Sequence, residues 1–248
     1  MKILRIQTSP RGEHSESRKL GDFLVAEAER TNRDVTTIVR DVSKGVAVPD
    51  LAWIGASFTD AVKRTDEQAR ALDHSEQLIA ELETTDLLVI EAPIWNFSIP
   101  ASLKSWIDQV ARARRTFRML ENGAEGLLKD RKTIVIVTTG GTPLGSGYDF
   151  ATPYLRFILG FIGIKNVTFI DAGRLQFEAD KPEKARAEIA ANLSAPLAEA
   201  GQRPPRVPEP TRPVRGTQCN PQTARVRSVH KKESRPCPVV SRRTSLPC

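Results

Sequence analysis

The sequence predicts a doubly wound α/β fold, in which a five-stranded parallel sheet carries helices on both faces. Short apolar runs alternate along the chain with amphipathic helical patterns, as expected of a parallel sheet. The runs are also almost continuously apolar, which is typical of strands that are covered on both faces. The five expected strands are residues 3–6, 35–39, 87–91, 132–137 and 166–171.

Helical spacing of apolar residues places the helices between these strands. In the first helix, Leu20, Phe23, Leu24 and Ala28 mark one face, and Ser15 or Ser17 is its expected N-cap. The others are a short helix from about Asp50 through Phe58, one from Asp66 to Glu83, one after Pro100, one with Thr152 as N-cap and Pro153 in its first turn, and one from Lys181 to about Ala200. Residues 113–130 instead predict a hairpin-like excursion with turns near Gly123 and Gly126.

Charge divides the chain into two parts. Residues 201–248 hold 11 Lys and Arg but only two acidic residues, whereas residues 1–200 are close to neutral. Nine of the 17 prolines also follow residue 200, and Phe, Trp and Tyr are absent there. Such a segment buries too little apolar surface to offset its conformational entropy. We therefore expect a domain over 1–200 and a disordered basic Pro/Arg-rich tail over 201–248.

The basic tail leaves one alternative open, an arm that binds RNA or an anionic membrane. The near-neutral body does not predict a nucleic-acid-binding protein. No run approaches the length of a membrane span, and no signal-peptide pattern is present at the start. We expect a cytoplasmic protein that does not contact a membrane.

Cysteine is confined to the tail, at Cys219, Cys237 and Cys248. Residues 1–200 therefore offer neither a disulfide framework nor a thiol nucleophile. The spacing of the three cysteines matches no zinc-ligand pattern, so no metal site is expected.

Three polar or aromatic loops follow the first, third and fourth strands. In a sheet of order 2-1-3-4-5, the carboxyl ends of these strands surround the switch point, so the loops share one cleft. The first loop offers Ser9, Ser15 and Ser17 beside a helix N-terminus, which suits a phosphate. It has neither the GxGxxG pattern nor a P-loop, and an ordinary Ser-capped helix is the alternative reading.

The second loop, residues 94–100, is the most informative of the three. Trp95 and Phe97 suit a planar ring, and the amide of Asn96 suits a polar ring edge, which indicates a flavin. The third loop, Thr138–Gly141, allows the backbone to approach a ligand closely, although a routine tight turn would have the same composition. We find no pair of a nucleophile and a base in the sequence, and such enzymes usually take their chemistry from a cofactor.

Four segments together resemble the FMN-dependent NADH:azoreductases, also described as NADH:quinone oxidoreductases. These segments are residues 9–17, 93–100, 117–127 and 160–164. They occur in the order and spacing of that family, and the resemblance covers about residues 1–195.

The resemblance implies a flavodoxin-like fold and a homodimer with one FMN per subunit. It also implies NADH or NADPH as donor, and two-electron (hydride) transfer in ping-pong order to quinones or azo compounds. The implied FMN-binding residues are Ser9, Ser15, Glu16, Ser17, Ile94, Trp95, Asn96, Phe97, Thr138, Thr139, Gly140 and Gly141. Phe117, and Phe161 of the partner subunit, would line an apolar substrate pocket.

Two positions depart from the family pattern. The family often has Met-Tyr where this chain has Ile94-Trp95, and some members have Ser-Arg at Thr138-Thr139. Both departures concern substrate preference more than FMN binding. The alternative function is a flavodoxin-type electron carrier with no small-molecule substrate, although such carriers are usually acidic and monomeric.

Overall fold

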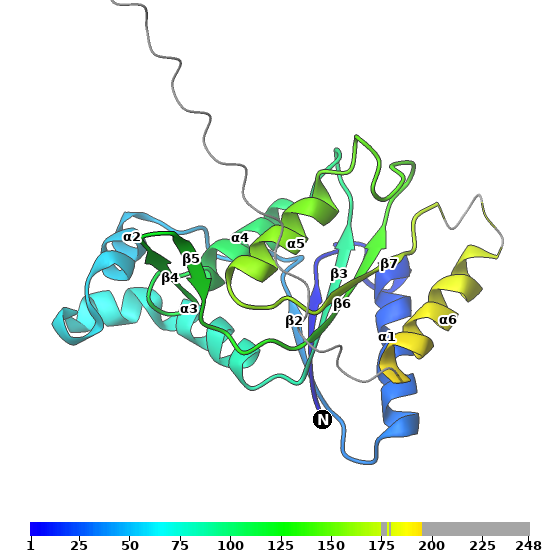
Figure 1. The fold of residues 1–248 in the computed structure, drawn as a ribbon, viewed down its shortest axis with the longest axis horizontal. Helices are drawn as coiled ribbons and strands as arrows, with labels where there is room; N and C mark the ends of the chain where they lie inside the picture. Colours follow the sequence, from blue (N-terminus) through cyan, green and yellow to red (C-terminus); the bar gives the residue numbers. More distant parts are fainter. Residues whose placement is uncertain (175–177, 179, 195–248) are drawn as a thin grey trace, which may run out of the picture. The chain divides into compact units, whose positions relative to one another are not determined.

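The computed structural model describes residues 1–174, 178 and 180–194. Its main sheet has five parallel strands in the order β2-β1-β3-β6-β7, which confirms the predicted order because β6 and β7 are its fourth and fifth strands along the chain (Figure 1). The strands are β1 (Lys2–Gln7), β2 (Thr36–Asp41), β3 (Leu87–Pro93), β6 (Lys132–Thr138) and β7 (Val167–Asp171).

Helices cover both faces of this sheet (Figure 1). One face carries α1 (Glu16–Thr31) and α6 (Lys181–Ser194). The other carries α3 (Asp66–Glu83), α4 (Ala101–Val110) and α5 (Ala151–Phe161). Successive side chains of a strand point to opposite faces. On β3, for example, Leu87 belongs to the core beneath α1 and α6, whereas Leu88 belongs to the core beneath α3, α4 and α5.

Local capping chemistry sets several helix boundaries. Thr65 and Gln68 form a reciprocal capping box at the start of α3, which begins and ends at the predicted residues. Asp50 caps α2 (Leu51–Phe58) by accepting a hydrogen bond from the Trp53 amide. Two short 3-10 helices, η1 (Gly12–His14) and η2 (Ala61–Lys63), precede α1 and α3.

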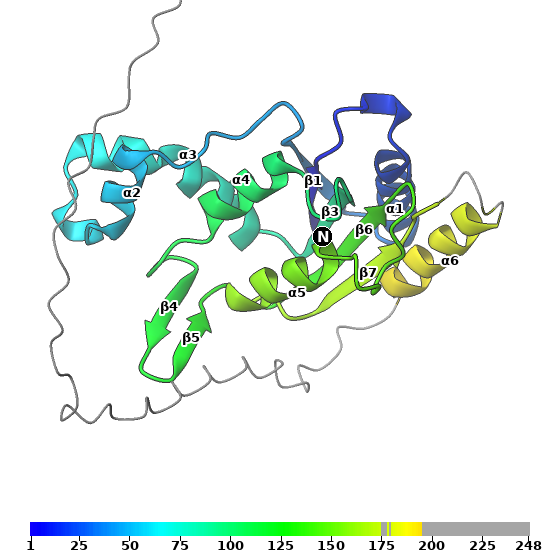
Figure 2. The same ribbon diagram turned by 90° about the horizontal axis from the view of Figure 1, so that it is seen from above.

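The predicted excursion is an antiparallel hairpin of β4 (Phe117–Leu120) and β5 (Gly123–Gly126) that projects away from the main sheet (Figure 2). Its base rests on the turn after α5. A Cβ on Gly126 would lie 2.1 Å from the Gly163 amide nitrogen, so this close backbone approach requires glycine.

The prediction for the start of α5 is wrong by about two residues. The helix begins at Ala151 rather than after Thr152, because the Asp149 carboxylate accepts hydrogen bonds from the Ala151 and Thr152 amides. Residues 195–200 of the last predicted helix, and the predicted tail 201–248 with its cysteines, lie outside the described residues. None of the helices within the described part is both long and apolar enough to cross a membrane.

Candidate functional site

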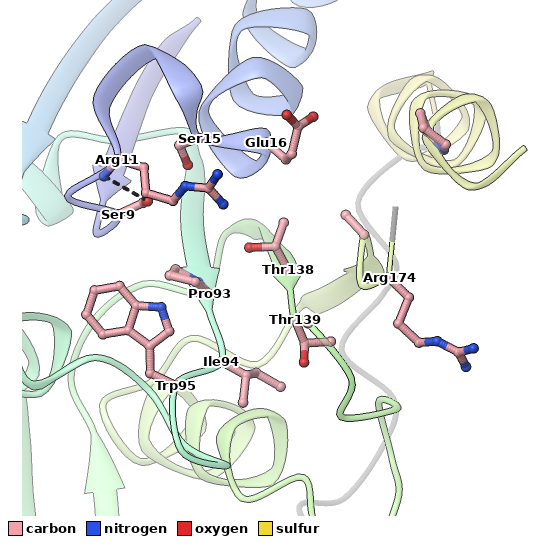
Figure 3. Close-up of a pocket in the computed structure, with 13 residues that line it drawn as sticks. Ser9, Arg11, Ser15, Glu16, Pro93, Ile94, Trp95, Thr138, Thr139 and Arg174 are labelled. Carbon is pink, nitrogen blue, oxygen red and sulfur yellow. Dashed lines mark hydrogen bonds between the residues drawn. The ribbon is translucent and has the colours of Figure 1, made fainter. Parts of the chain in front are cut away.

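A cavity of about 490 Å³ opens at the carboxyl ends of β1, β3, β6 and β7 (Figure 3). This is the end of an open α/β sheet at which ligands bind, and the volume is in the range of small-molecule sites. Its lining residues are Ser9, Arg11, Ser15, Glu16, Pro93, Ile94, Trp95, Thr138, Thr139, Gly140, Ala172, Arg174 and Pro182.

The loop after β1 forms a polar wall of the cavity. Ser9 and Ser15 line it although each is only 3% exposed. Ser15 is the N-cap residue of α1, but its hydroxyl pairs with the Ser17 hydroxyl at 3.0 Å and makes no capping hydrogen bond. The first amides of α1 therefore have no side-chain cap, and they face a cavity end that favours an anion. Ser17 is fully buried and supports Ser15 from behind.

Arg18 holds this loop in place. Its guanidinium donates to the Ser9 carbonyl oxygen and to the Asp41 carboxylate, both at 2.9 Å. It also donates to the Ser43 hydroxyl at 3.2 Å. These hydrogen bonds join the Arg18 side chain to the loop after β1 and to the end of β2.

The loop after β3 is a tight two-residue turn. The Trp95 amide donates to the Ser98 carbonyl oxygen at 2.9 Å, and the Ser98 amide returns a hydrogen bond to Trp95 at 3.1 Å. Between them, Asn96 and Phe97 have φ angles of 48° and 73°. Positive φ at both central residues is what a type I′ turn requires, and for a side chain as bulky as Phe it is strained. Ile94 and Trp95 line the cavity, whereas Asn96 and Phe97 are exposed beside it.

The loop after β6 is ordered by its own hydroxyl and by the start of α5. The Thr139 hydroxyl accepts hydrogen bonds from the amides of Gly141 and Thr142, at 3.2 and 2.9 Å. The Phe150 amide donates to the Phe97 carbonyl oxygen at 3.0 Å, which ties the start of α5 to the tight turn. Gly141 does not line the cavity, although Thr138, Thr139 and Gly140 do.

Sequence reasoning missed a fourth loop, the one after β7. Ala172 and Arg174 line the cavity, and the Arg174 amide donates to the Thr139 carbonyl oxygen at 2.8 Å. Because β7 runs parallel to the other strands, its carboxyl end lies at the same edge of the sheet. The predicted strand order could therefore have indicated that the loop after β7 reaches the cavity. Arg11 and Pro182 were missed as well. Arg11 lies within the segment 9–17, but only the serines and Glu16 of that segment were assigned to the ligand, and Pro182 belongs to no recognised motif.

The structure places the two predicted substrate-pocket residues together but away from this cavity. The rings of Phe117 and Phe161 of one chain lie 4.5 Å apart, at the contact between the hairpin and α5. Neither residue lines the cavity.

A buried ion pair joins β1 and β3 beneath α1. The Arg5 guanidinium donates twice to Oε1 of Glu91, at 2.8 and 2.6 Å, while Oε2 has no hydrogen-bond partner among the described residues. Burial raises the pKa of Glu91 to about 7, although Arg5 acts to lower it. The Thr8 hydroxyl donates to the Glu91 carbonyl oxygen at 2.7 Å and so joins the ends of β1 and β3.

The side chains that line the cavity include no nucleophile paired with a base. The described residues also contain no cluster of His, Cys, Asp and Glu that could hold a metal ion. What the cavity offers is hydroxyls, free helix amides and a strained aromatic turn, a set that suits a phosphate-bearing planar ligand.

Comparison with known proteins places the chain in a family. Residues 1–197 match the family described as having a flavodoxin-like fold. A protein of Hahella chejuensis named FMN-dependent NADH:quinone oxidoreductase 1 is 45% identical over 194 residues, covering 78% of this chain and 94% of that protein. A protein of Thiobacillus denitrificans named FMN-dependent NADH:quinone oxidoreductase is 44% identical over 193 residues, covering 78% of this chain and 94% of that protein.

Solved structures agree on the fold. An azoreductase from Bacillus anthracis superposes with a TM-score of 0.67 at 24% identity, covering 78% of this chain and 97% of its own. An FMN-dependent NADH-azoreductase from the same species, solved with FMN, gives a TM-score of 0.69 at 23% identity over the same shares. The family match and the identities to the two relatives lead to one conclusion: this chain belongs to the flavodoxin-like family of FMN-dependent NADH:quinone oxidoreductases.

Proposed function

We propose that this protein is an FMN-dependent oxidoreductase that uses NADH or NADPH to reduce quinones and azo compounds. One observation carries the proposal. A single cavity combines a hydroxyl-lined helix N-terminus at one wall with Ile94 and Trp95, which lead into the strained turn, at another. These are the two features that a phosphate and a planar ring of one ligand need.

The residues of this chain fit FMN in the following way. Ser9, Ser15 and the first amides of α1 would bind the phosphate, with Ser17 behind them. Ile94 and Trp95 would cover the flavin ring, and the amides of Asn96 and Phe97 would donate to its edge. Thr138–Gly141 would contact the pyrimidine side of the ring.

When bound, FMN supplies the two-electron hydride chemistry that the side chains of this cavity lack. The protein contributes binding, orientation and exclusion of water. The apolar surfaces of Ile94 and Trp95 keep water from the ring. The rigid turn fixes its donors before any ligand arrives, so no reorganisation is needed during the reaction.

We further propose that donor and acceptor occupy this cavity in turn, which gives ping-pong kinetics. Supporting this order, the described residues form one large cavity at the switch point of the sheet. Initial rates at several quinone concentrations should then give parallel double-reciprocal lines against NADH. Intersecting lines would contradict the ordering without affecting the cofactor assignment.

The active species is proposed to be a homodimer. Large apolar side chains are exposed in the single chain. Trp95 lines the cavity, Tyr148 lies beside Phe97 of the tight turn and Phe157 lies on α5, and they are 45%, 68% and 55% exposed. The sequence assigned only Phe161 to a partner subunit. Because the rings of Phe117 and Phe161 touch within one chain, we propose instead that both would line the substrate pocket of the neighbouring subunit. Light scattering on the full chain tests the dimer.

The decisive experiment is to purify the full chain, extract and identify any flavin, and add NADH under nitrogen. We expect a yellow protein that NADH bleaches and that turns over with a quinone or an azo dye as sole acceptor. A colourless protein that FMN does not reconstitute would overturn the proposal. Bleaching without turnover would instead indicate the electron carrier.

A further inference from the structure

Three charged side chains line the cavity, Arg11, Glu16 and Arg174. They differ in whether each has a partner of opposite charge. The Glu16 carboxylate is paired with Lys19 at 2.8 Å, and Arg174 lies 3.7 Å from Glu178. The Arg11 guanidinium makes no hydrogen bond or ion pair within the described residues. Its hydrogen bonds there come from the backbone alone, one of them from its amide to the Ser9 hydroxyl at 3.4 Å.

The local backbone presents Arg11 to the cavity. Arg11 is the residue before η1, and its carbonyl oxygen accepts a hydrogen bond from the His14 amide at 3.1 Å. Gly12 follows with a φ of 56°, a conformation that glycine adopts at no steric cost. Figure 3 shows the Arg11 side chain reaching from this turn toward the wall that carries Ser15 and Glu16.

That wall would be electrostatically incomplete without Arg11. A phosphate monoester carries a charge of about −1.5 to −2 at neutral pH. Hydroxyls and helix amides solvate this charge but do not neutralise it, and the Glu16 carboxylate adds a like charge. The guanidinium of Arg18, two residues after Glu16, already donates hydrogen bonds to Ser9, Asp41 and Ser43.

We propose that Arg11 is the cation that binds the phosphate of the cofactor, and that it determines the preference of this protein for FMN over riboflavin. A guanidinium binds phosphate through paired, charge-assisted hydrogen bonds. Riboflavin has the same ring and ribityl chain but no phosphate, so it gains nothing from Arg11. The inference rests on the proposed function, because it assumes that the cavity binds a flavin.

The test is to titrate the full chain, freed of flavin, with FMN and with riboflavin while following flavin fluorescence. Arg11→Gln should weaken FMN binding about tenfold to a hundredfold, the effect of one charge-assisted contact, and leave riboflavin binding within about twofold. Arg11→Lys keeps the charge and should recover part of the loss. The matched control is Arg174→Gln, which removes a charge from another wall and should leave the FMN-to-riboflavin affinity ratio unchanged.

For a second variant we expect FMN affinity to change in the opposite direction. Glu16→Gln removes the like charge and should tighten FMN binding about two- to fivefold, the strength of an exposed charge interaction, without affecting riboflavin.

The outcomes separate this inference from the proposed function. If the unmodified chain binds neither flavin, the proposed function fails. If it binds FMN tightly but Arg11→Gln weakens both flavins equally, or neither, the proposed function stands and the role of Arg11 is overturned. Circular dichroism of Arg11→Gln and Arg11→Lys excludes misfolding as the cause of a change.

Discussion

Asn96 occupies a backbone conformation that few residues tolerate. Its φ of 48° lies in the left-handed region, where Asn and Gly are accepted and β-branched residues are not. We expect Asn96→Gly to keep the turn and most of the FMN affinity. Asn96→Val should distort the turn at a cost of about 1–3 kcal/mol and weaken FMN binding at least tenfold. Fluorescence titration measures both variants, and equal affinities would show that the turn conformation does not matter.

Glu91 makes stability depend on pH. Its folded-state pKa of about 7 lies above its ordinary value of 4.5, so the folded protein binds the proton more tightly. The stabilisation is complete below pH 4.5 and is lost as the pH rises through about 7. Arg5, Asp22 and Arg18 are the charged groups that act on it.

Glu91→Gln should therefore remove a pH-dependent difference of about 3 kcal/mol in the free energy of unfolding between pH 4.5 and 7. Urea unfolding at several pH values measures it. Asp22→Asn is the matched control, because Asp22 contacts the same Arg5 at 2.8 Å but its side chain is 68% exposed. The same pH slope in both variants would contradict the assignment.

Side chains that accept hydrogen bonds from the first helix amides set helix boundaries. At the start of α5, such a side chain also orders a loop beside the cavity. Burial acts to raise the pKa of Asp149, but hydrogen bonds from Thr152, Gly145 and Ala151 hold it below its ordinary value. The carboxylate therefore fixes both the helix start and the loop before it. Through the contact of Phe150 with Phe97, this order extends to the aromatic turn.

Asp149 precedes the N-cap residue Phe150 but accepts the hydrogen bonds of the first helix amides. Asp149→Ala should therefore lower the free energy of unfolding by about 1–2 kcal/mol, as the loss of a capping side chain does, and should weaken FMN binding severalfold. Asp50→Ala is the matched control, since it removes the cap of α2, which does not line the cavity. Its unfolding free energy should fall similarly while FMN affinity stays constant. Thermal unfolding and flavin titration of both variants provide the comparison.

Elements with strong local signals could be predicted from the sequence, and elements that depend on distant contacts could not. The predicted bounds of α3 are confirmed at both ends, and the capping box of Thr65 and Gln68 is the local feature that fixes its start. By contrast, Ser15 is a residue type that commonly caps helices and was predicted to cap α1. Its hydroxyl instead pairs with the Ser17 hydroxyl. The strand order brings the loop after β7 to the cavity, but the Arg174 amide is held there by a hydrogen bond to the Thr139 carbonyl oxygen, and no local pattern indicates that contact.

The cavity lining within the described residues runs from Ser9 to Pro182, and these residues also include the core on both faces of the sheet. The two relatives named above match over 194 and 193 residues, which are 94% of their own lengths. The sequence after residue 200 contributes a charge of about +9 to a near-neutral body. Charge of this kind affects solubility and nonspecific binding rather than the fold.

Removing residues 201–248 should therefore leave the FMN affinity and the turnover number for quinone within about twofold of those of the full chain, since long-range charge effects are screened beyond about 10 Å at 0.1 M salt. The truncated chain should elute much earlier from a cation-exchange column, which confirms that the charge has gone. Flavin content, steady-state rates and elution volume are measured on both forms at the same salt concentration. Loss of both flavin and activity on truncation, with the circular dichroism spectrum retained, would show instead that the basic segment takes part in the site.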